Sequence, residues 1–266
     1  MQMTKTTFLV TGFSTFHGVD ANPTERLAAW LKVNLEQGNP MLGQDFEVHD
    51  VSILNVAATD VDAYFAQLAH QLEQGAVQGI SSGAAPAGAE GEVLIGHFAA
   101  AAVAPPPLQP PSQRVVLLHL GVATTATEYR LESRAANCAN FRVPDERGWS
   151  PAMEEIEPGR GTDSWVGSGL PLAAVCERLA ARGHNVMVSE DAGQFVCNWT
   201  YYRACRLAER YAGMQAVFVH VPPLEVEDEA KQRAFLLDAM REIARLRACP
   251  FSAATDVPPK EALSSV

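Results

Sequence analysis

One cysteine of this chain stands where its side chain could act as a nucleophile. Cys197 lies in the stretch VSEDAGQFVCNWTYY, after an Ala-Gly turn and just before an aromatic-rich helical pattern. Its sulfur is therefore expected near a helix N-terminus, where unpaired N–H groups and the helix dipole favour a thiolate. The same N–H groups could hold the oxyanion of a tetrahedral intermediate. On position alone, an inert thiol packed in the core is also an open interpretation.

A nucleophilic thiol needs a base and a group that orients the base. His220 lies in AVFVHVPP, at the end of an expected central strand, where α/β sheets place functional groups. Glu132, in YRLESRAANCANFRVPD, is the candidate that would hold the imidazole. Taken singly, His220 could be structural and Glu132 a solvated surface acid. The catalytic hypothesis gains weight because Cys197 and His220 both point to one rim of a sheet.

The composition narrows the class of protein. The chain has 266 residues, 47% hydrophobic and 19% charged, which is typical of a soluble globular protein. A net charge of -11 without clustered Lys and Arg argues against nucleic acid as a partner. No segment approaches the ~18 apolar residues of a membrane span, and the N-terminus lacks a secretory signal pattern. Five scattered cysteines without CxxC pairs argue against disulfides and zinc. We expect a cytoplasmic protein without membrane association.

Short apolar runs alternate with longer helical patterns along the chain. Asn22 is a suitable N-cap and Pro23 suits the first helical position. Alternation of this kind predicts a largely parallel sheet with helices on both faces. The expected strands are 7–13, 46–53, 114–122, 185–193 and 215–222, and the expected helices are 22–38, 61–74, 170–184, 196–213 and 227–248.

Two segments depart from this alternation. Residues 78–112 are rich in Gly, Ala and Pro and are too long for an ordinary connection. This excursion is either a surface insertion without a role, or a cover over the site or subunit contact. We expect one domain over residues 1–250 that contains the excursion, and a mobile tail over 251–266.

Four motifs of the chain resemble those of the pyroglutamyl peptidase I (pyrrolidone-carboxylate peptidase) family of cysteine peptidases. LVTGFSTFHGVDANPTE resembles the family's opening VTGFxPFGG…NPS, and LESRAANCANFRVPD resembles ERVAIN…PD. SGLPLAAVCERLAARGHNVMVSEDAGQFVCNWTYYRA resembles the LP…S…AGxFVCN…Y block, and VFVHVPPL resembles FIHVP. The motifs occur in the family's order and cover most of the chain outside the excursion.

The resemblance implies a fold, an activity and roles for particular residues. The fold would be a three-layer α/β/α sandwich with a mixed, largely parallel central sheet. Cys197 would be the nucleophile, His220 the general base and acid, and Glu132 the orienting group. The activity would be removal of N-terminal pyroglutamate from peptides without metal or cofactor, in a homo-oligomer like the often tetrameric bacterial members. The residues implied to bind the lactam are Phe13, Phe16, Phe195 and Val196.

The chain departs from the family pattern near the expected pocket. Thr15 replaces the usual Pro and His17 the usual Gly, while LHLGVATTATEYRLE lacks the bacterial GQAGGR and is closer to the GMATT of animal relatives. Trp199 should lie along the helix, outside the pocket. These departures leave two alternatives open: a cysteine hydrolase for another cyclic or acylated N-terminus, and a non-catalytic protein that binds the lactam.

Overall fold

A six-stranded sheet is the centre of the fold. The computed structural model describes residues 5–39, 42, 45–75 and 114–246. Within these residues the sheet has the strand order β2-β1-β3-β8-β4-β7, and β5 pairs with β6 in a separate antiparallel sheet. The strands are β1 (Thr6–Phe13), β2 (Phe46–Leu54), β3 (Arg114–Val122), β4 (Tyr129–Glu132), β5 (Arg134–Ala136), β6 (Trp165–Gly167), β7 (Val186–Ser189) and β8 (Met214–Val221).

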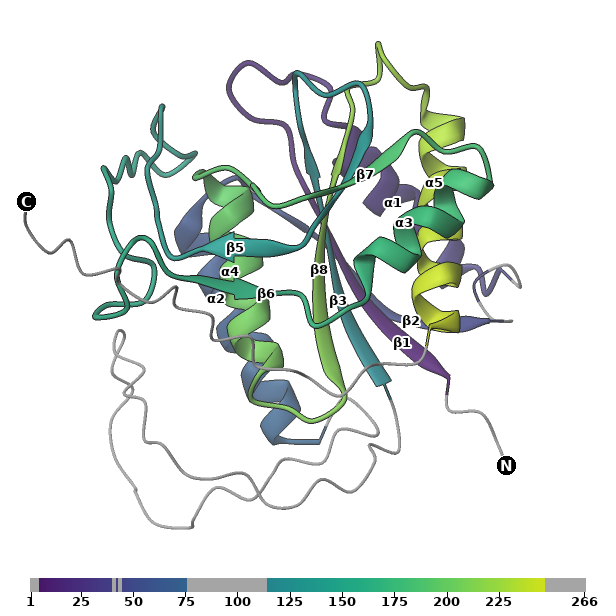
Figure 1. Cartoon of the computed structure of the whole chain (residues 1–266), viewed down its shortest axis with the longest axis horizontal. Coiled ribbons are helices and arrows are strands. Elements are labelled where there is room, and N and C mark those ends of the chain that lie inside the picture. Colours follow the sequence, from purple (N-terminus) through teal and green to yellow (C-terminus); the bar gives the residue numbers. More distant parts are fainter. Residues whose placement is uncertain (1–4, 40–41, 43–44, 76–113, 247–266) are drawn as a thin grey trace, which may run out of the picture.

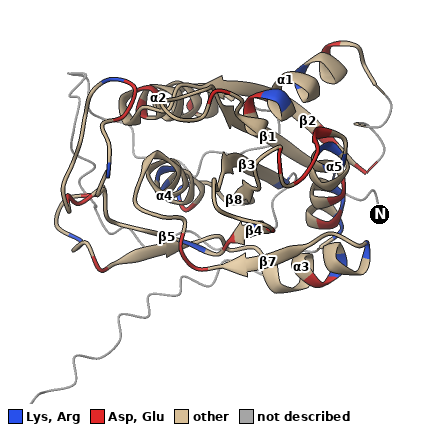
Figure 2. Ribbon diagram, turned by 90° about the horizontal axis from the view of Figure 1, so that it is seen from above, with Lys and Arg blue, Asp and Glu red and all other residues tan. Residues whose placement is uncertain are grey.

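Helices cover both faces of the sheet. The helices are α1 (Pro23–Glu36), α2 (Ala58–Glu73), α3 (Leu172–Ala181), α4 (Val196–Ala208) and α5 (Glu229–Arg245). Figure 2 shows α2 and α4 on one face and α1, α3 and α5 on the other, and one buried apolar cluster lies on each side. The predicted three-layer α/β/α sandwich is therefore confirmed (Figure 1).

Local signals explain where several elements begin. The side chain of Asn22 accepts a hydrogen bond from the backbone N–H of Thr24, and Pro23 is the first residue of α1. This is the predicted cap, and it satisfies one of the N–H groups that the helix itself leaves free. β3 spans the predicted residues 114–122.

One strand pair of the sheet is antiparallel, whereas the alternation of strands and helices by itself favours parallel pairing. β2, β1, β3 and β8 run parallel, but β4 is antiparallel to β8 and parallel to β7. The strand that precedes α4 therefore runs opposite to β8, and the sheet is mixed. β4, which ends at Glu132, is not among the strands that the pattern predicts, because four residues carry little periodicity.

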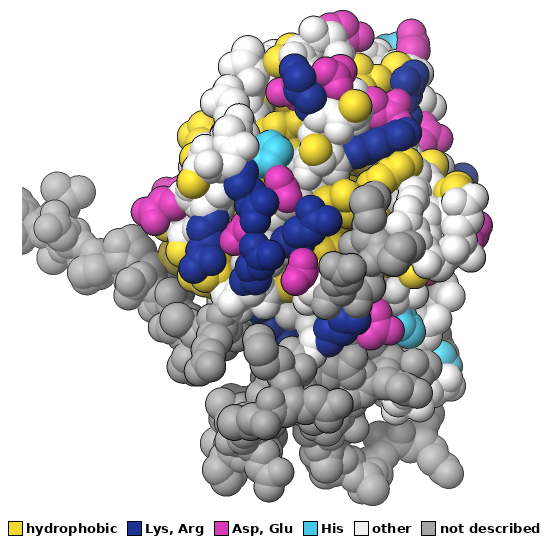
Figure 3. All heavy atoms as spheres, turned by 90° about the vertical axis from the view of Figure 1, so that its right-hand side faces the viewer, with side chains coloured by type: hydrophobic (Ala, Val, Ile, Leu, Met, Phe, Trp, Pro, Cys, Tyr) yellow, Lys and Arg dark blue, Asp and Glu magenta, His cyan; other side chains and the backbone are white. Residues whose placement is uncertain are grey.

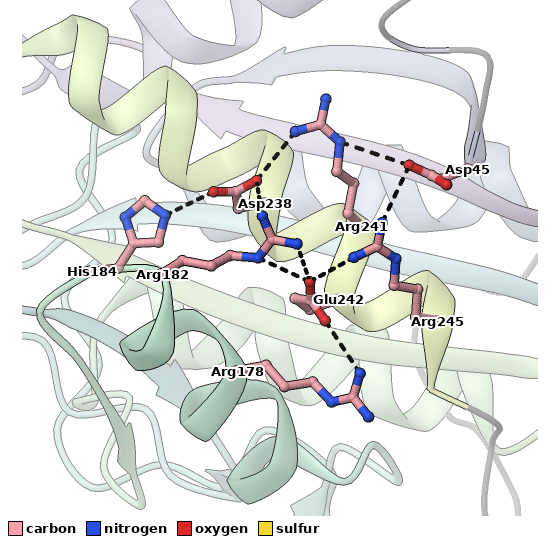
Figure 4. Close-up of polar contacts among 8 residues, drawn as sticks. All are labelled: Asp45, Arg178, Arg182, His184, Asp238, Arg241, Glu242 and Arg245. Carbon is pink, nitrogen blue, oxygen red and sulfur yellow. Dashed lines mark hydrogen bonds and ion pairs between the residues drawn. The ribbon is translucent and has the colours of Figure 1, made fainter.

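A buried acid links α3 to α5 on the face away from α4. Glu242, only 3% exposed, accepts hydrogen bonds from Arg182 (2.7 and 3.0 Å) and Arg245 (3.0 Å), with Arg178 3.5 Å away. Figure 4 shows these groups converging, with Asp238 one turn before Glu242. Figure 3 views this side of the molecule, where basic and acidic side chains are interspersed. The network joins the C-terminal end of α3 to α5.

The excursion at 78–112 and the tail at 251–266 lie outside the described residues. The proposed single domain and the role of the excursion stay predictions.

Candidate active site

Cys197 is the second residue of α4. The helix begins at Val196, and its N-cap Phe195 makes no side-chain cap hydrogen bond. Because the first N–H groups of a helix have no partner within it, those near the sulfur can face an incoming oxygen. Cys197 is half-buried, whereas Cys205 on the same helix is 2% exposed. The thiol lies where the sequence predicts it, at a helix N-terminus.

Strand register brings Glu132 and His220 together. The antiparallel pairing of β4 with β8 sets Arg130 opposite His220 and Glu132 opposite Phe218. Opposed residues point to the same face of a sheet, and so do alternate residues of one strand. Glu132 and His220 are therefore diagonal neighbours on the face covered by α4. Nδ1 of His220 donates to Oε1 of Glu132 at 2.7 Å.

The imidazole of His220 also contacts the thiol. The interaction of the ring with Cys197 is one of the causes that raise the pKa of His220. Since Nδ1 faces Glu132, Nε2 is the ring nitrogen left for the sulfur. The three predicted residues thus form one chain of contacts, from the sulfur through the imidazole to the carboxylate. This is the order of nucleophile, base and orienting group in covalent catalysis.

The electrostatics of the site favour a protonated imidazole. Burial alone would lower the pKa of His220, which is 7% exposed. Hydrogen bonds to Cys197 and Glu132, and the charges of both groups, outweigh burial and raise the pKa of His220 to about 9. Glu132 is fully buried, and its Oε2 has no hydrogen-bond partner among the described residues. A buried carboxylate needs a neighbouring cation, and the imidazolium is placed to supply it.

Space for the thiol depends on Gly121, which is paired with His220 across β3 and β8. A Cβ atom at this position would lie 2.7 Å from the ring of Phe218 and 3.0 Å from Sγ of Cys197. Any larger residue would therefore displace the sulfur or the ring. The sequence marks the Gly121–Thr125 loop as a departure from the family pattern, but the space that Gly121 leaves for the thiol is not visible there, because its neighbours come from β8 and α4.

The four residues predicted to bind the lactam belong to one apolar cluster or pack against it. Phe13 and Val196 are buried, 2% and 0% exposed, within the apolar cluster on the α4 side of the sheet. Phe16, Phe195 and Cys197 are partly exposed and pack against that cluster. Of the four, only Phe16 and Phe195 therefore have partly exposed side chains.

A series of aromatic rings supports Phe195 from behind. Its ring packs edge-on against Phe141, with centroids 4.7 Å apart, and Phe141 packs in turn against Trp149 at 5.2 Å. Trp149 contacts Trp199 at the same spacing, and its backbone N–H donates to Asp145 at 3.0 Å. The Pro-Asp motif that followed from the resemblance thus orders the loop whose aromatic rings pack against Phe195.

The residues that depart from the family pattern have identifiable surroundings. The backbone N–H of His17 donates to Glu146 at 3.0 Å, and that of Thr15 donates to Glu25 at 3.1 Å. These two carboxylates hold the loop that lacks the usual proline. His17 is exposed. Trp199 lies along α4, as expected, and is 7% exposed.

Within residues 5–39, 42, 45–75 and 114–246, no three His, Cys, Asp or Glu side chains gather in a way that could hold a metal ion. No helix formed by these residues is long and apolar enough to cross a membrane.

A thiol, an imidazole and a carboxylate in contact beside an α/β sheet are the functional unit of cysteine hydrolases. The chain belongs to the pyroglutamyl peptidase family, whose model matches residues 94–246. The matched region contains Glu132, Cys197 and His220; the first of the four motifs lies before it.

Curated relatives match over a shorter stretch. The chain is 35% identical over 112 residues to human pyroglutamyl-peptidase 1-like protein, covering 42% of this chain and 54% of that protein. It is 32% identical over 115 residues to the pyrrolidone-carboxylate peptidase of Klebsiella pneumoniae, covering 43% of this chain and 53% of the relative. In these alignments the chain spans about half the length of the relatives it matches.

Solved structures show the same fold over nearly the whole chain. Pyroglutamyl peptidase I from Bacillus amyloliquefaciens matches with a TM-score of 0.64 and 20% identity, covering 92% of this chain and 97% of the other. The pyrrolidone carboxyl peptidase of Thermococcus litoralis matches with a TM-score of 0.63 and 19% identity, covering 89% and 92%. At such identities the likeness establishes the fold.

Proposed function

We propose that this chain is a cysteine omega-peptidase that removes an N-terminal pyroglutamyl residue from peptides. Cys197 is the nucleophile, His220 the general acid and base, and Glu132 the group that orients His220. The observation that carries the proposal is the hydrogen bond between His220 and Glu132, together with the interaction of the same imidazole with Cys197 at the start of α4. Membership of the pyroglutamyl peptidase family supports the choice of substrate.

The reaction follows from these contacts. The sulfur of Cys197 attacks the pyroglutamyl carbonyl carbon, and N–H groups at the start of α4 stabilise the resulting oxyanion. His220 gives its proton to the departing amine, the C–N bond breaks, and a thioester remains on the sulfur. His220 then takes a proton from water, which attacks the thioester and releases pyroglutamate. Glu132 keeps Nδ1 of the imidazole protonated and stabilises its positive charge.

An apolar aromatic pocket suits the proposed substrate. A pyroglutamyl residue has no charged α-amine, so a site that grips an ammonium group cannot hold it. A flat lactam fits between aromatic side chains, with a few hydrogen bonds from backbone groups. We assign the exposed walls to Phe16 and Phe195 and the floor to the buried Phe13 and Val196.

The pH profile should reflect His220. Its pKa of about 9 means that the imidazole is protonated at neutral pH and can act as the acid for the departing amine. As the pH rises through about 9, the proton is lost, so kcat/KM should fall about tenfold per pH unit beyond that point. Initial rates on a pyroglutamyl amide between pH 5 and 11 measure this limb. A fall in kcat/KM that begins near the ordinary pKa of a histidine would contradict this assignment of the alkaline limb to His220.

A substrate panel tests the function itself. Pyroglutamyl, prolyl and acetyl-aminoacyl amides of one chromophore should be compared, each with and without prior iodoacetamide treatment. We expect release from the pyroglutamyl amide alone, abolished by alkylation. Pyroglutamate binding without turnover would instead support a non-catalytic lactam-binding protein.

A second candidate is a cysteine hydrolase for another cyclic or acylated N-terminus. It is favoured by His17, which is exposed and whose backbone is held by Glu146 in the loop that also carries Phe16. Faster release from the acetyl-aminoacyl amide than from the pyroglutamyl amide would establish this alternative.

Substitution of Gly121 should impair the thiol without removing a functional group. Gly121→Ala is expected to lower kcat/KM about 10- to 100-fold, because the added methyl displaces Sγ of Cys197 or the Phe218 ring. Gly167→Ala is the matched control, since its Cβ would meet neighbours only at 3.6 and 3.7 Å, an ordinary contact. Steady-state kinetics and melting temperatures should be measured for both variants, to separate an effect on the thiol from a general loss of stability. Unchanged kinetics in Gly121→Ala would show that the sulfur is not seated against this glycine.

We also propose a cytoplasmic location and a homo-oligomeric state. Cys138, Cys176, Cys197 and Cys205, the described cysteines, are all free, which suits a reducing compartment. Light scattering of the purified protein measures the oligomeric state.

A further inference from the structure

Tyr201 links the helix of the nucleophile to the strand of the orienting acid. It lies on α4, four residues after Cys197, so both side chains are on the same side of the helix. The hydroxyl of Tyr201 donates to the backbone carbonyl of Glu132 at 2.6 Å. The side chain is 0% exposed, and its ring packs against Phe218, with centroids 6.0 Å apart.

This hydrogen bond is available over the whole range in which the enzyme would work. Burial raises the pKa of Tyr201 well above its ordinary value, and the nearby Cys205 and Glu132 add to the increase while Ser168 opposes it. The hydroxyl therefore stays protonated and keeps its donor. Leaving this buried hydroxyl without a hydrogen-bond partner would cost free energy. The bond to the Glu132 carbonyl therefore restrains the distance between α4 and the end of β4.

A second side chain of α4 holds the same stretch of chain. Asn198 accepts from the backbone N–H of Ala136 at 2.8 Å and donates to the carbonyls of Ala136 and Cys138 at 2.8 and 3.0 Å. Tyr201 and Asn198 of α4 therefore hold the chain just before β5 and at its end. Of the two links, only that of Tyr201 acts on Glu132 itself.

We propose that Tyr201 is a positioning residue, which holds Glu132 at hydrogen-bonding distance from His220 through its bond to the Glu132 carbonyl. Glu132 is the last residue of β4, where the strand ladder ends, so this bond restrains its main chain at the end of the strand. Without it, the carboxylate can shift away from Nδ1 of the imidazole. The proposal rests on the proposed catalytic roles of Cys197, His220 and Glu132.

Tyr201→Phe tests this role because it keeps the ring and removes only the hydroxyl. Weaker contact with Glu132 should reduce the stabilisation of the imidazolium, so the alkaline limb of kcat/KM should move about 0.5–1 pH unit lower. At neutral pH, kcat/KM should fall about five- to tenfold. The rate at which iodoacetamide alkylates Cys197, followed by peptide mapping over the same pH range, should show the same displacement and does not depend on turnover.

Tyr202→Phe is the matched control. Tyr202 is the next residue of α4, is 1% exposed and donates its hydroxyl to Glu157 at 3.1 Å, away from the proposed catalytic residues. Its loss should lower the melting temperature about as much as Tyr201→Phe and leave both pH profiles unchanged. Profiles of Tyr201→Phe that coincide with wild type would overturn the positioning role alone. If the rate of Cys197 alkylation in the wild-type protein did not change with pH near 9, the pKa of His220, the result would instead contradict the proposed catalytic roles on which the positioning role rests.

Discussion

Replacement of Cys197 by alanine is expected to lower kcat/KM on a pyroglutamyl amide by about 10⁴-fold or more. The sulfur is the only atom of the contact chain that can form the thioester, and neither His220 nor Glu132 can replace it. Because Cys197 is half-buried at a helix N-terminus, the substitution removes little packing, and the melting temperature should change by only a few degrees.

Cys205→Ala is the matched control for Cys197→Ala. Cys205 lies on the same helix, eight residues further along, and is 2% exposed. Burial raises the pKa of its thiol, and the charge of Glu209 adds to the effect. This thiol should therefore resist iodoacetamide, and its loss should leave kcat/KM within about threefold of wild type while lowering stability. If Cys197→Ala kept its turnover, Cys197 could not be the nucleophile.

Replacement of His220 by asparagine is expected to cost about 10³- to 10⁴-fold in kcat/KM. The amide Nδ2 of asparagine can still donate to Oε1 of Glu132, so the local hydrogen bond is kept while the proton carrier and the positive charge are lost. The buried carboxylate then has no counter-charge beside it, which should also lower the melting temperature. Alkylation of Cys197 at neutral pH should slow at the same time, because no imidazolium remains to stabilise the thiolate.

The chain offers a second histidine–carboxylate pair as a control. Nε2 of His184 lies 3.0 Å from Oδ2 of Asp238, in the network between α3 and α5 (Figure 4). His184→Asn breaks a pair of the same kind on the opposite face of the sheet and should leave kcat/KM and thiol reactivity near wild type. Equal losses in the His184 and His220 variants would indicate a general effect on stability instead of a role in proton transfer.

Local chemistry made much of the fold predictable. Asn22 and Pro23 mark the start of α1, and the apolar run at 114–122 forms β3 as expected. The start of α4 followed from the change from the Asp-Ala-Gly turn to a helical pattern, which placed Cys197 at the helix N-terminus. These features depend on residues that are close together in the sequence, so they can be predicted from the sequence alone.

The remaining features depend on partners far along the chain. β4 has four residues, and its direction is determined by pairing with β8 and β7, roughly 60 to 90 positions later. Glu132 by itself resembles a surface acid, and only contact with His220, 88 positions away, explains its complete burial. Gly121 and Tyr201 are likewise defined by atoms of other elements.

The central claim is that pyroglutamate passes through a covalent bond to Cys197. The most direct test mixes the enzyme with a pyroglutamyl ester, quenches with acid within milliseconds to seconds, and maps the modified peptide by mass spectrometry. We predict a mass increase of one pyroglutamyl acyl group on the peptide containing Cys197, absent after iodoacetamide treatment and released by hydroxylamine. Product formation with no acyl group on this peptide at any quench time, or with the group on another residue, would contradict the account.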